Sequence, residues 1–94
     1  MVPYLFCFRA ASAGRTEVFE YLLKQGAELA LQDSDGKTAL HRAVENGRVE
    51  ICKIILDYKR HELKNIKDNH GRIPLDLNTS DNAEYISNIF KSYE

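Results

Sequence analysis

Histidine and cysteine are the residues of this sequence whose types most often carry chemistry, as proton donors, nucleophiles or metal ligands. His41, His61 and His70 never occur at an H-x-x-x-H spacing, and neither Cys7 nor Cys52 belongs to a C-x-x-C pair. Zinc sites are usually marked by such closely spaced ligands. The glycine-rich signatures of phosphate loops, dinucleotide-binding turns and activated serines do not occur either. The sequence therefore predicts no catalytic site, no metal and no cofactor.

The composition is that of a small globular domain. The chain has 94 residues, of which 44% are hydrophobic and 29% charged, and its net charge is -1. We therefore expect one domain over residues 1–94, with no overall attraction to nucleic acid. No stretch approaches the ~20 apolar residues of a membrane span. The apolar start lacks a basic n-region, and both cysteines lie in apolar runs, so we expect an intracellular protein, cytoplasmic or nuclear.

An internal repeat organises the sequence. Residues 10–23 recur as residues 43–56 with a constant offset of 33. A second match, offset by 35, links residues 33–40 to residues 68–75, so two residues are inserted within 58–65. The polar pairs of the first match are Gly14 with Gly47, Arg15 with Arg48, and Glu17 with Glu50.

The middle copy carries the motif that indicates a known family. Its marker residues are Asp33, Gly36, Thr38, Ala39, Leu40, His41 and Ala43, followed by Gly47, Glu50 and the run Ile54, Ile55, Leu56. This pattern resembles the ankyrin repeat, which has a period of about 33 residues and a T-P-L-H-x-A core. The resemblance implies an all-α solenoid of about two and a half stacked helix-turn-helix units with β-turn fingers. The approximate repeats are residues 5–32, 33–67 and 68–91.

Local chemistry predicts the elements of the middle copy independently. Residues 33–37 favour a tight turn, in which Gly36 takes a positive φ. Thr38 is a good N-cap, so a helix is expected over residues 39–46 and ends at Gly47. A second helix is expected over residues 49–57, apolar on two sides because neighbouring repeats cover it. No glycine follows it, so we expect it to run on or to end in an irregular loop.

His41 belongs to the motif, and the resemblance gives it a structural role. In the family such a ring bonds the threonine at the position of Thr38 and nearby backbone, which fixes the turn between repeats. We therefore expect no chemistry at His41.

The two ends depart from the motif in different ways. In the first copy a hydrophobic block replaces it, and we expect self-association or cover by a preceding segment at Tyr4, Leu5, Phe6 and Phe8. In the last copy Pro74 is suited to the first position of a helix. A final helix is expected after Asp81 or Asn82, with an inward face of Ile86, Ile89 and Phe90 and a polar outer face that caps the stack.

The predicted function is binding of another protein, without catalysis. Partners of this family usually meet the finger tips and the exposed face of the first helices. The residues of this chain at those places are Ser34, Asp35, Lys37, Arg42, Glu45, Asn46, Asn69, His70 and Arg72.

Two other functions stay open. One is a regulatory or targeting segment of a larger enzyme or channel, which a longer natural reading frame would favour. The other is weak nucleic-acid binding through the basic segment 59–72, which steeply salt-dependent binding would favour. Glu62 and Asp68 interrupt that segment, so a solvated loop is the better interpretation and a nucleic-acid partner is not expected.

Overall fold

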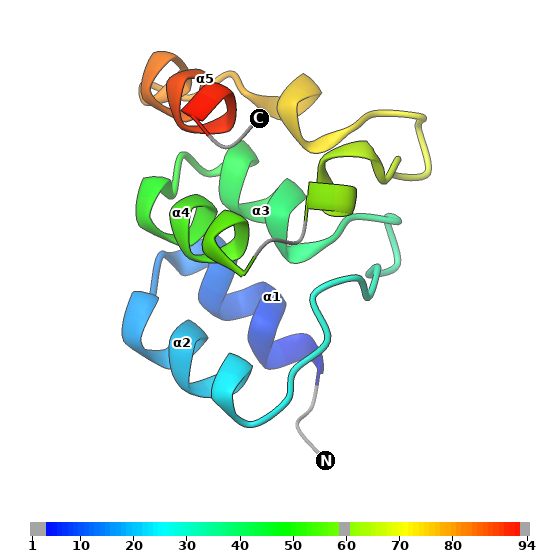
Figure 1. Ribbon diagram of the computed structural model, residues 1–94. Helices are drawn as coiled ribbons and strands as arrows, with labels where there is room; N and C mark the ends of the chain where they lie inside the picture. Colours follow the sequence, from blue (N-terminus) through cyan, green and yellow to red (C-terminus); the bar gives the residue numbers. More distant parts are fainter. Residues whose placement is uncertain (1–3, 59–60, 93–94) are drawn as a thin grey trace.

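The computed structural model describes residues 4–58 and 61–92, and this part of the chain is helical without a strand (Figure 1). Of Tyr4, Leu5 and His61 it describes the backbone only. The elements are α1 (Tyr4–Ala13), α2 (Thr16–Lys24), α3 (Ala39–Glu45), α4 (Val49–Asp57), the 3-10 helices η1 (His61–Asn65) and η2 (Pro74–Leu77), and α5 (Ala83–Ser92).

The elements stack in three layers of helix pairs. The first helices form one column, in which α1 packs on α3 and α3 on η2. The second helices form the other column, in which α2 packs on α4 and α4 on α5 (Figure 1). The turns between layers project to one side of the columns. The predicted all-α solenoid is therefore confirmed.

Glycines end the first helix of two layers as the sequence predicts. Gly14 and Gly47 have φ of 73° and 68°, a left-handed conformation that favours glycine. The residue after each glycine donates its N–H back into the helix, from Arg48 to the Ala43 carbonyl at 2.8 Å and from Arg15 to the Ala10 carbonyl at 2.9 Å. This closure satisfies carbonyls that the helix end leaves unpaired.

The core lies between the two columns, and the middle layer supplies more of it than either of the other two layers. Helix α4 has the predicted bounds, and Ile51, Cys52, Ile55 and Leu56 are fully buried. It is apolar on two sides because α2 covers one and α5 covers the other. Helix α3 contributes the predicted stripe of Leu40, Ala43 and Val44, also fully buried.

In the first layer, part of the apolar block that we expected to be exposed is buried. Cys7 and Phe8 point into the core and are almost fully buried, whereas Phe6 is about half exposed. Phe8 is therefore not available for self-association, and that part of the prediction is wrong. The reason is helical geometry, since residues two apart on a helix lie on different faces. The side chains of Tyr4 and Leu5 lie outside the described residues.

The last layer follows the prediction both in its final helix and at Pro74, which stands at the first position of a helix. Pro74 begins η2, a single 3-10 turn in place of the α-helix that the other layers have there. Helix α5 buries Ile86, Ile89 and Phe90 as expected. Helix α4 ends at Asp57, and the predicted irregular loop falls on residues 59–60, which lie outside the described part.

Truncation of Leu40 tests this core. Leu40 is fully buried between layers, so Leu40→Ala should lower the free energy of unfolding by about 2–5 kcal/mol through lost burial and a residual cavity. Leu31→Ala is the matched control, because Leu31 is exposed and should cost far less. Urea unfolding curves compare the two variants, and a Leu40→Ala curve that overlays the wild type would contradict the placement.

Candidate protein-binding face

The first finger, residues 33–37, is a turn built around one aspartate. The N–H of Asp33 donates to the Lys37 carbonyl at 2.8 Å, and the Asp33 carboxylate accepts from the N–H groups of Asp35 at 2.9 Å and Lys37 at 3.0 Å. Gly36 has φ of 77° at the tip. This is the side-chain-to-backbone bonding that aspartate favours in turns.

The second finger, residues 68–72, repeats the same construction. The N–H of Asp68 donates to the Arg72 carbonyl at 2.8 Å, and the Asp68 carboxylate accepts from the N–H groups of His70 at 2.8 Å and Arg72 at 2.9 Å. Burial of this carboxyl opposes its ionisation, but those N–H groups and the Arg72 guanidinium lower the pKa of Asp68 to about 2. The charged form of Asp68 therefore holds the finger.

The two fingers are joined through Asn69. Its N–H donates to the Asp35 carbonyl at 2.9 Å, and its side-chain amide donates to the Ser34 carbonyl at 2.9 Å. Gly36 lies directly under this contact, where an added Cβ would stand 2.7 Å from the backbone nitrogen of Asn69. The two fingers, residues 33–37 and 68–72, therefore form one continuous surface, which we call the finger ledge.

His41 links that ledge to α3. The N–H of Thr38 donates to His41 Nδ1 at 3.1 Å, so Nδ1 is an acceptor and the proton of the neutral ring is on Nε2. Nε2 then donates to the Arg72 carbonyl of the second finger at 2.9 Å. The Thr38 hydroxyl accepts from the His41 N–H at 3.3 Å and completes a capping box. The predicted structural role of His41 is confirmed.

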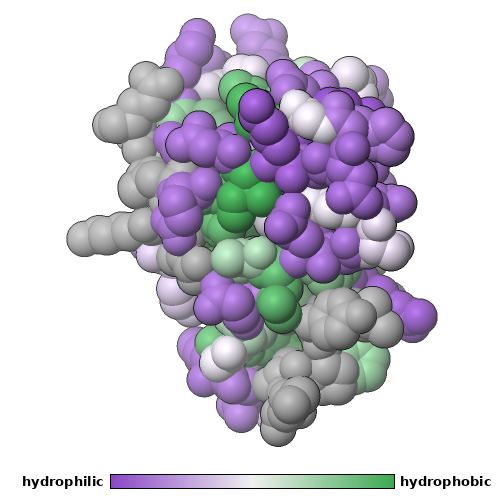
Figure 2. Space-filling model, turned by 90° about the vertical axis from the view of Figure 1, so that its right-hand side faces the viewer, coloured by the Kyte–Doolittle hydropathy of each residue, from purple (hydrophilic) through white to green (hydrophobic). Residues whose placement is uncertain are grey.

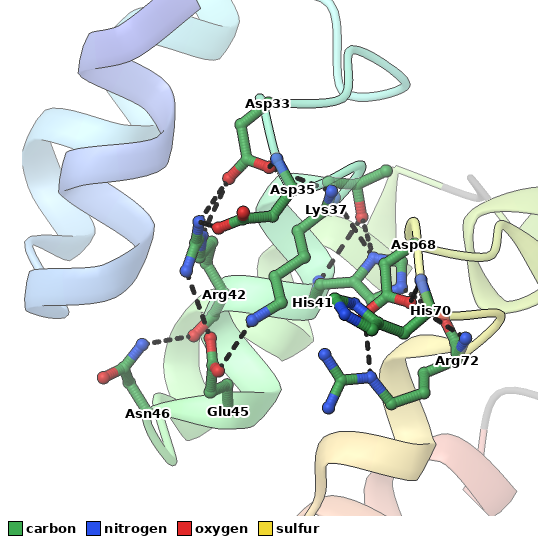
Figure 3. Close-up of polar contacts among 11 residues, drawn as sticks. Asp33, Asp35, Lys37, His41, Arg42, Glu45, Asn46, Asp68, His70 and Arg72 are labelled. Atoms are coloured by element: carbon green, nitrogen blue, oxygen red, sulfur yellow. Dashed lines mark hydrogen bonds and ion pairs between the residues drawn. The ribbon is translucent and has the colours of Figure 1, made fainter.

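An ionic cluster lies between the first finger and α3 (Figure 3). Arg42 Nη2 and Nε lie 2.6 Å and 2.9 Å from Asp33 Oδ2, and Nη2 lies 3.1 Å from an Asp35 oxygen. On the other side Glu45 accepts from Lys37 Nζ at 2.9 Å and lies 3.4 Å from Arg42. Burial disfavours the charge on Asp33, but hydrogen bonds from Lys37, Arg42 and Asp35 lower its pKa overall.

The structure divides the nine predicted contact residues into three groups. The finger tips and the end of α3 expose Ser34, Asp35, Asn46, Asn69 and His70. Arg42, Glu45 and Arg72 are half-buried and already paired within the chain. Lys37 is only 8% exposed, so its expected exposure is wrong. Its ammonium is bound by Glu45.

Helix α1 adds residues to this face that the motif does not indicate. A shallow hollow of about 500 Å³ lies between α1 and the first finger, and Arg9 and Ser12 line one side of it while Asp33 and Ser34 line the other. Arg9 stands 33 residues before Arg42, so the repeat offset is the signal that would have found it. Figure 2 views the finger side, where hydrophilic side chains surround a narrow hydrophobic strip.

Within residues 4–58 and 61–92, no group of three or more histidine, cysteine, aspartate or glutamate side chains is arranged so that it could hold a metal ion. No helix in the same part has the length and apolarity to cross a membrane. Lys59 and Arg60 of the basic segment lie outside the described residues, and Arg72 is paired with Asp68 at 3.0 Å.

Layers of helix pairs, each joined to the next through a turn finger, define a solenoid repeat domain. The family model of ankyrin repeats in three copies matches residues 7–91, so the chain belongs to the ankyrin-repeat family. The truncated first and last copies thus count as repeats. Ankyrin repeats are protein-binding modules and generally catalyse no reaction.

The chain is similar to parts of much longer proteins. It is 42% identical over 48 residues to protein phosphatase 1 regulatory subunit 12A of Mus musculus. This match covers 51% of this chain and 5% of the relative. It is 35% identical over 85 residues to inhibitor of Bruton tyrosine kinase of Xenopus laevis, covering 88% and 6%, respectively. Inversin of Gallus gallus is 40% identical over 77 residues, covering 82% and 6%. The chain thus spans less than a tenth of each of these relatives.

The ledge contact can be tested with two glycines. Gly36→Ala and Gly26→Ala both place a side chain at positive φ, which costs roughly 1–2 kcal/mol. An added Cβ at Gly26 meets nothing within 4 Å, whereas at Gly36 it meets Asn69. Gly36→Ala should therefore lower the free energy of unfolding clearly more than Gly26→Ala. Equal losses in urea unfolding would show that the fingers do not pack as described.

The second test of this face uses the pH dependence of stability. Burial lowers the pKa of His41 below its ordinary value of 6.5, so below that pH the unfolded chain binds more protons than the folded one. The contribution of the neutral His41 ring to the free energy of unfolding is therefore fully present above about pH 6.5, and it is lost as the pH drops below that value. The decrease between about pH 7 and pH 5.5 should shrink in His41→Gln and persist in the control His70→Gln, whose ring is exposed. An unchanged slope in His41→Gln would contradict the neutral, buried ring.

Proposed function

We propose that this chain binds another protein through the finger ledge and the adjoining end of α3, without catalysis. The observation that supports it most is the fixed ledge itself. Exposed polar groups of Ser34, Asp35 and His70 stand on a backbone that Asn69 and His41 hold in place. A partner that meets such a surface loses little free energy to ordering it.

The chemistry of the ledge suggests the contacts that a partner makes. Asp35 exposes its carboxylate, and Ser34 and Asn46 add small polar groups. On the far side of the hollow, the Arg9 guanidinium makes no hydrogen bond or ion pair within the described residues. We propose charge-assisted hydrogen bonds at the rim, with an apolar side chain of the partner between α1 and the finger.

The variant Asp35→Lys/His70→Glu tests the ledge. Both side chains are exposed, so the fold should survive while capture of the natural partner from a reducing cell extract falls at least tenfold. Glu20→Lys is the matched control, because the Glu20 side chain is exposed on α2, away from the ledge. This variant should capture as much of the partner as the wild type does. Arg42→Glu is a poor probe, because it would place a carboxylate beside Asp33 and Glu45.

An unchanged partner yield from the double variant, with the thermal melting curve also unchanged, would overturn the proposed face. A loss in both the double variant and Glu20→Lys would place the contact elsewhere. Quantitative mass spectrometry of the captured proteins reads out both outcomes.

A reducing compartment, cytoplasmic or nuclear, is proposed with this function. Burial raises the pKa of the Cys52 thiol to about 12 and raises that of Cys7 as well, so both are poor nucleophiles. Both cysteines are free and buried in the core. A stack that keeps two buried thiols unpaired suits such a compartment.

A regulatory segment of a larger protein is the second candidate. The matching relatives include one printed as a regulatory subunit and one as an inhibitor, and the matched part is a small share of each. Sequencing of the natural transcript tests it, because a catalytic domain in the same reading frame would favour this candidate over a free-standing adaptor.

A further inference from the structure

The Arg72 side chain of the second finger is anchored at one end and free at the other. Its Nε donates to Asp68 Oδ2 at 3.0 Å, and its backbone N–H donates to the other oxygen of that carboxylate at 2.9 Å. Its carbonyl accepts from the Asp68 N–H at 2.8 Å and from His41 Nε2 at 2.9 Å. The two Nη nitrogens make no hydrogen bond or ion pair within residues 4–58 and 61–92 (Figure 3). Because 42% of the side chain is exposed, this pair of donors is available to a partner.

Arg42, the arginine of α3 beside the first finger, has no such free end. Its Nε and Nη2 donate to Asp33 at 2.9 Å and 2.6 Å, and Nη2 lies 3.1 Å from an Asp35 oxygen. Its Nη1 lies 3.4 Å from Glu45. All three nitrogens of this guanidinium therefore have partners inside the chain. Of the two arginines at the fingers, Arg72 is the better placed to pair with a group from outside.

Other groups of the second finger support the attraction of an anion. Lys67 directly precedes the finger and is exposed, and its ammonium makes no ion pair within the described part of the chain. His70 exposes a ring that can donate a hydrogen bond. The negative charge of the finger is that of Asp68, whose side chain is fully buried. An anion that approaches the second finger therefore meets its cations before its carboxylate.

We propose that the second finger binds an acidic side chain of the partner protein, whose carboxylate pairs end-on with the two Nη nitrogens of Arg72. This inference rests on the proposed function, because it names the chemistry that the finger ledge recognises in the partner. A guanidinium matches a carboxylate through two parallel hydrogen bonds. Asp68 and His41 already hold Arg72, so the pairing orders little that was free before.

The acidic groups near the first finger explain why a single carboxylate fits this surface better than the phosphates of a nucleic acid. The side chain of Asp35 is 59% exposed and that of Glu45 is 34% exposed. A phosphate backbone that ran along the finger ledge from Arg72 would meet both carboxylates, whereas one acidic side chain needs the second finger alone. The charges of the ledge therefore favour a protein partner with an acidic residue opposite the second finger.

Random peptides displayed on phage and selected on the wild-type chain test the proposal. Aspartate and glutamate should be enriched among the binders, and these peptides, once synthesised, should bind Arg72→Gln about tenfold more weakly in titrations. Lys53→Gln is the matched control, because it removes an exposed positive charge on α4 and should bind the peptides as the wild type does. Arg72→Lys keeps the charge but loses the fork of two nitrogens, so it should restore only part of the affinity.

A second variant separates the loss of the Nη nitrogens from damage to the finger. Lys67→Gln leaves every bond of Arg72 and Asp68 in place, and it should also weaken the acidic peptides. Binders without acidic residues, or equal binding by the wild type, Arg72→Gln and Lys67→Gln, would overturn the proposal. So would tighter binding of a single-stranded DNA oligonucleotide than of the selected peptides, because it would assign these cations to phosphate.

Capture of the natural partner distinguishes this proposal from the proposed function. A capture that is lost in Asp35→Lys/His70→Glu but kept in Arg72→Gln would overturn the pairing with Arg72 and leave the finger ledge as the contact surface. A capture that is kept in both variants would overturn both.

Discussion

The His41 imidazole connects the parts of this fold that sequence alone leaves separate. Its two nitrogens bond the Thr38 N–H at the start of α3 and the Arg72 carbonyl of the second finger. Each such bond contributes only about 0.5–1.5 kcal/mol net, but a buried group that loses its partner costs about 1–3 kcal/mol. Because one ring satisfies groups from two layers, α3 and the second finger keep a fixed relative position.

That fixed position gives the polar contacts around it their geometry. Asn69 of the second finger reaches Ser34 and Asp35 of the first only because the two turns stay in register. In the last layer Asp76 stands where His41 would be, and its carboxylate accepts the Ile73 N–H at 3.0 Å. A carboxylate can close its own turn in this way, but it has no N–H to donate to another layer. Asp76 therefore cannot make the bond that His41 makes to the following finger.

The sequence predicted the middle layer best because local and tertiary signals agree there. Thr38 as cap, Gly47 as terminator and the stripe of Leu40, Ala43 and Val44 all specify one helix, and the structure has it. The burial of Lys37 was not predictable, because it depends on how the finger packs against α3. The same holds for the first layer. Phe6 and Phe8 are equally apolar in sequence, and only the direction of α1 decides which is buried.

The two outer faces of the stack differ in a way that bears on stability. A solenoid is held by contacts between neighbouring layers, so an outer layer is stabilised from one side only. Helix α5 meets this constraint with an exposed face that includes Glu84, Asn88 and Lys91 beside one exposed aromatic ring, Tyr85. Helices α1 and α2 instead expose Phe6, Val18 and Tyr21. Burial of one large apolar side chain is worth about 1.5–3 kcal/mol, so any cover of these side chains adds to the marginal stability of a three-layer stack.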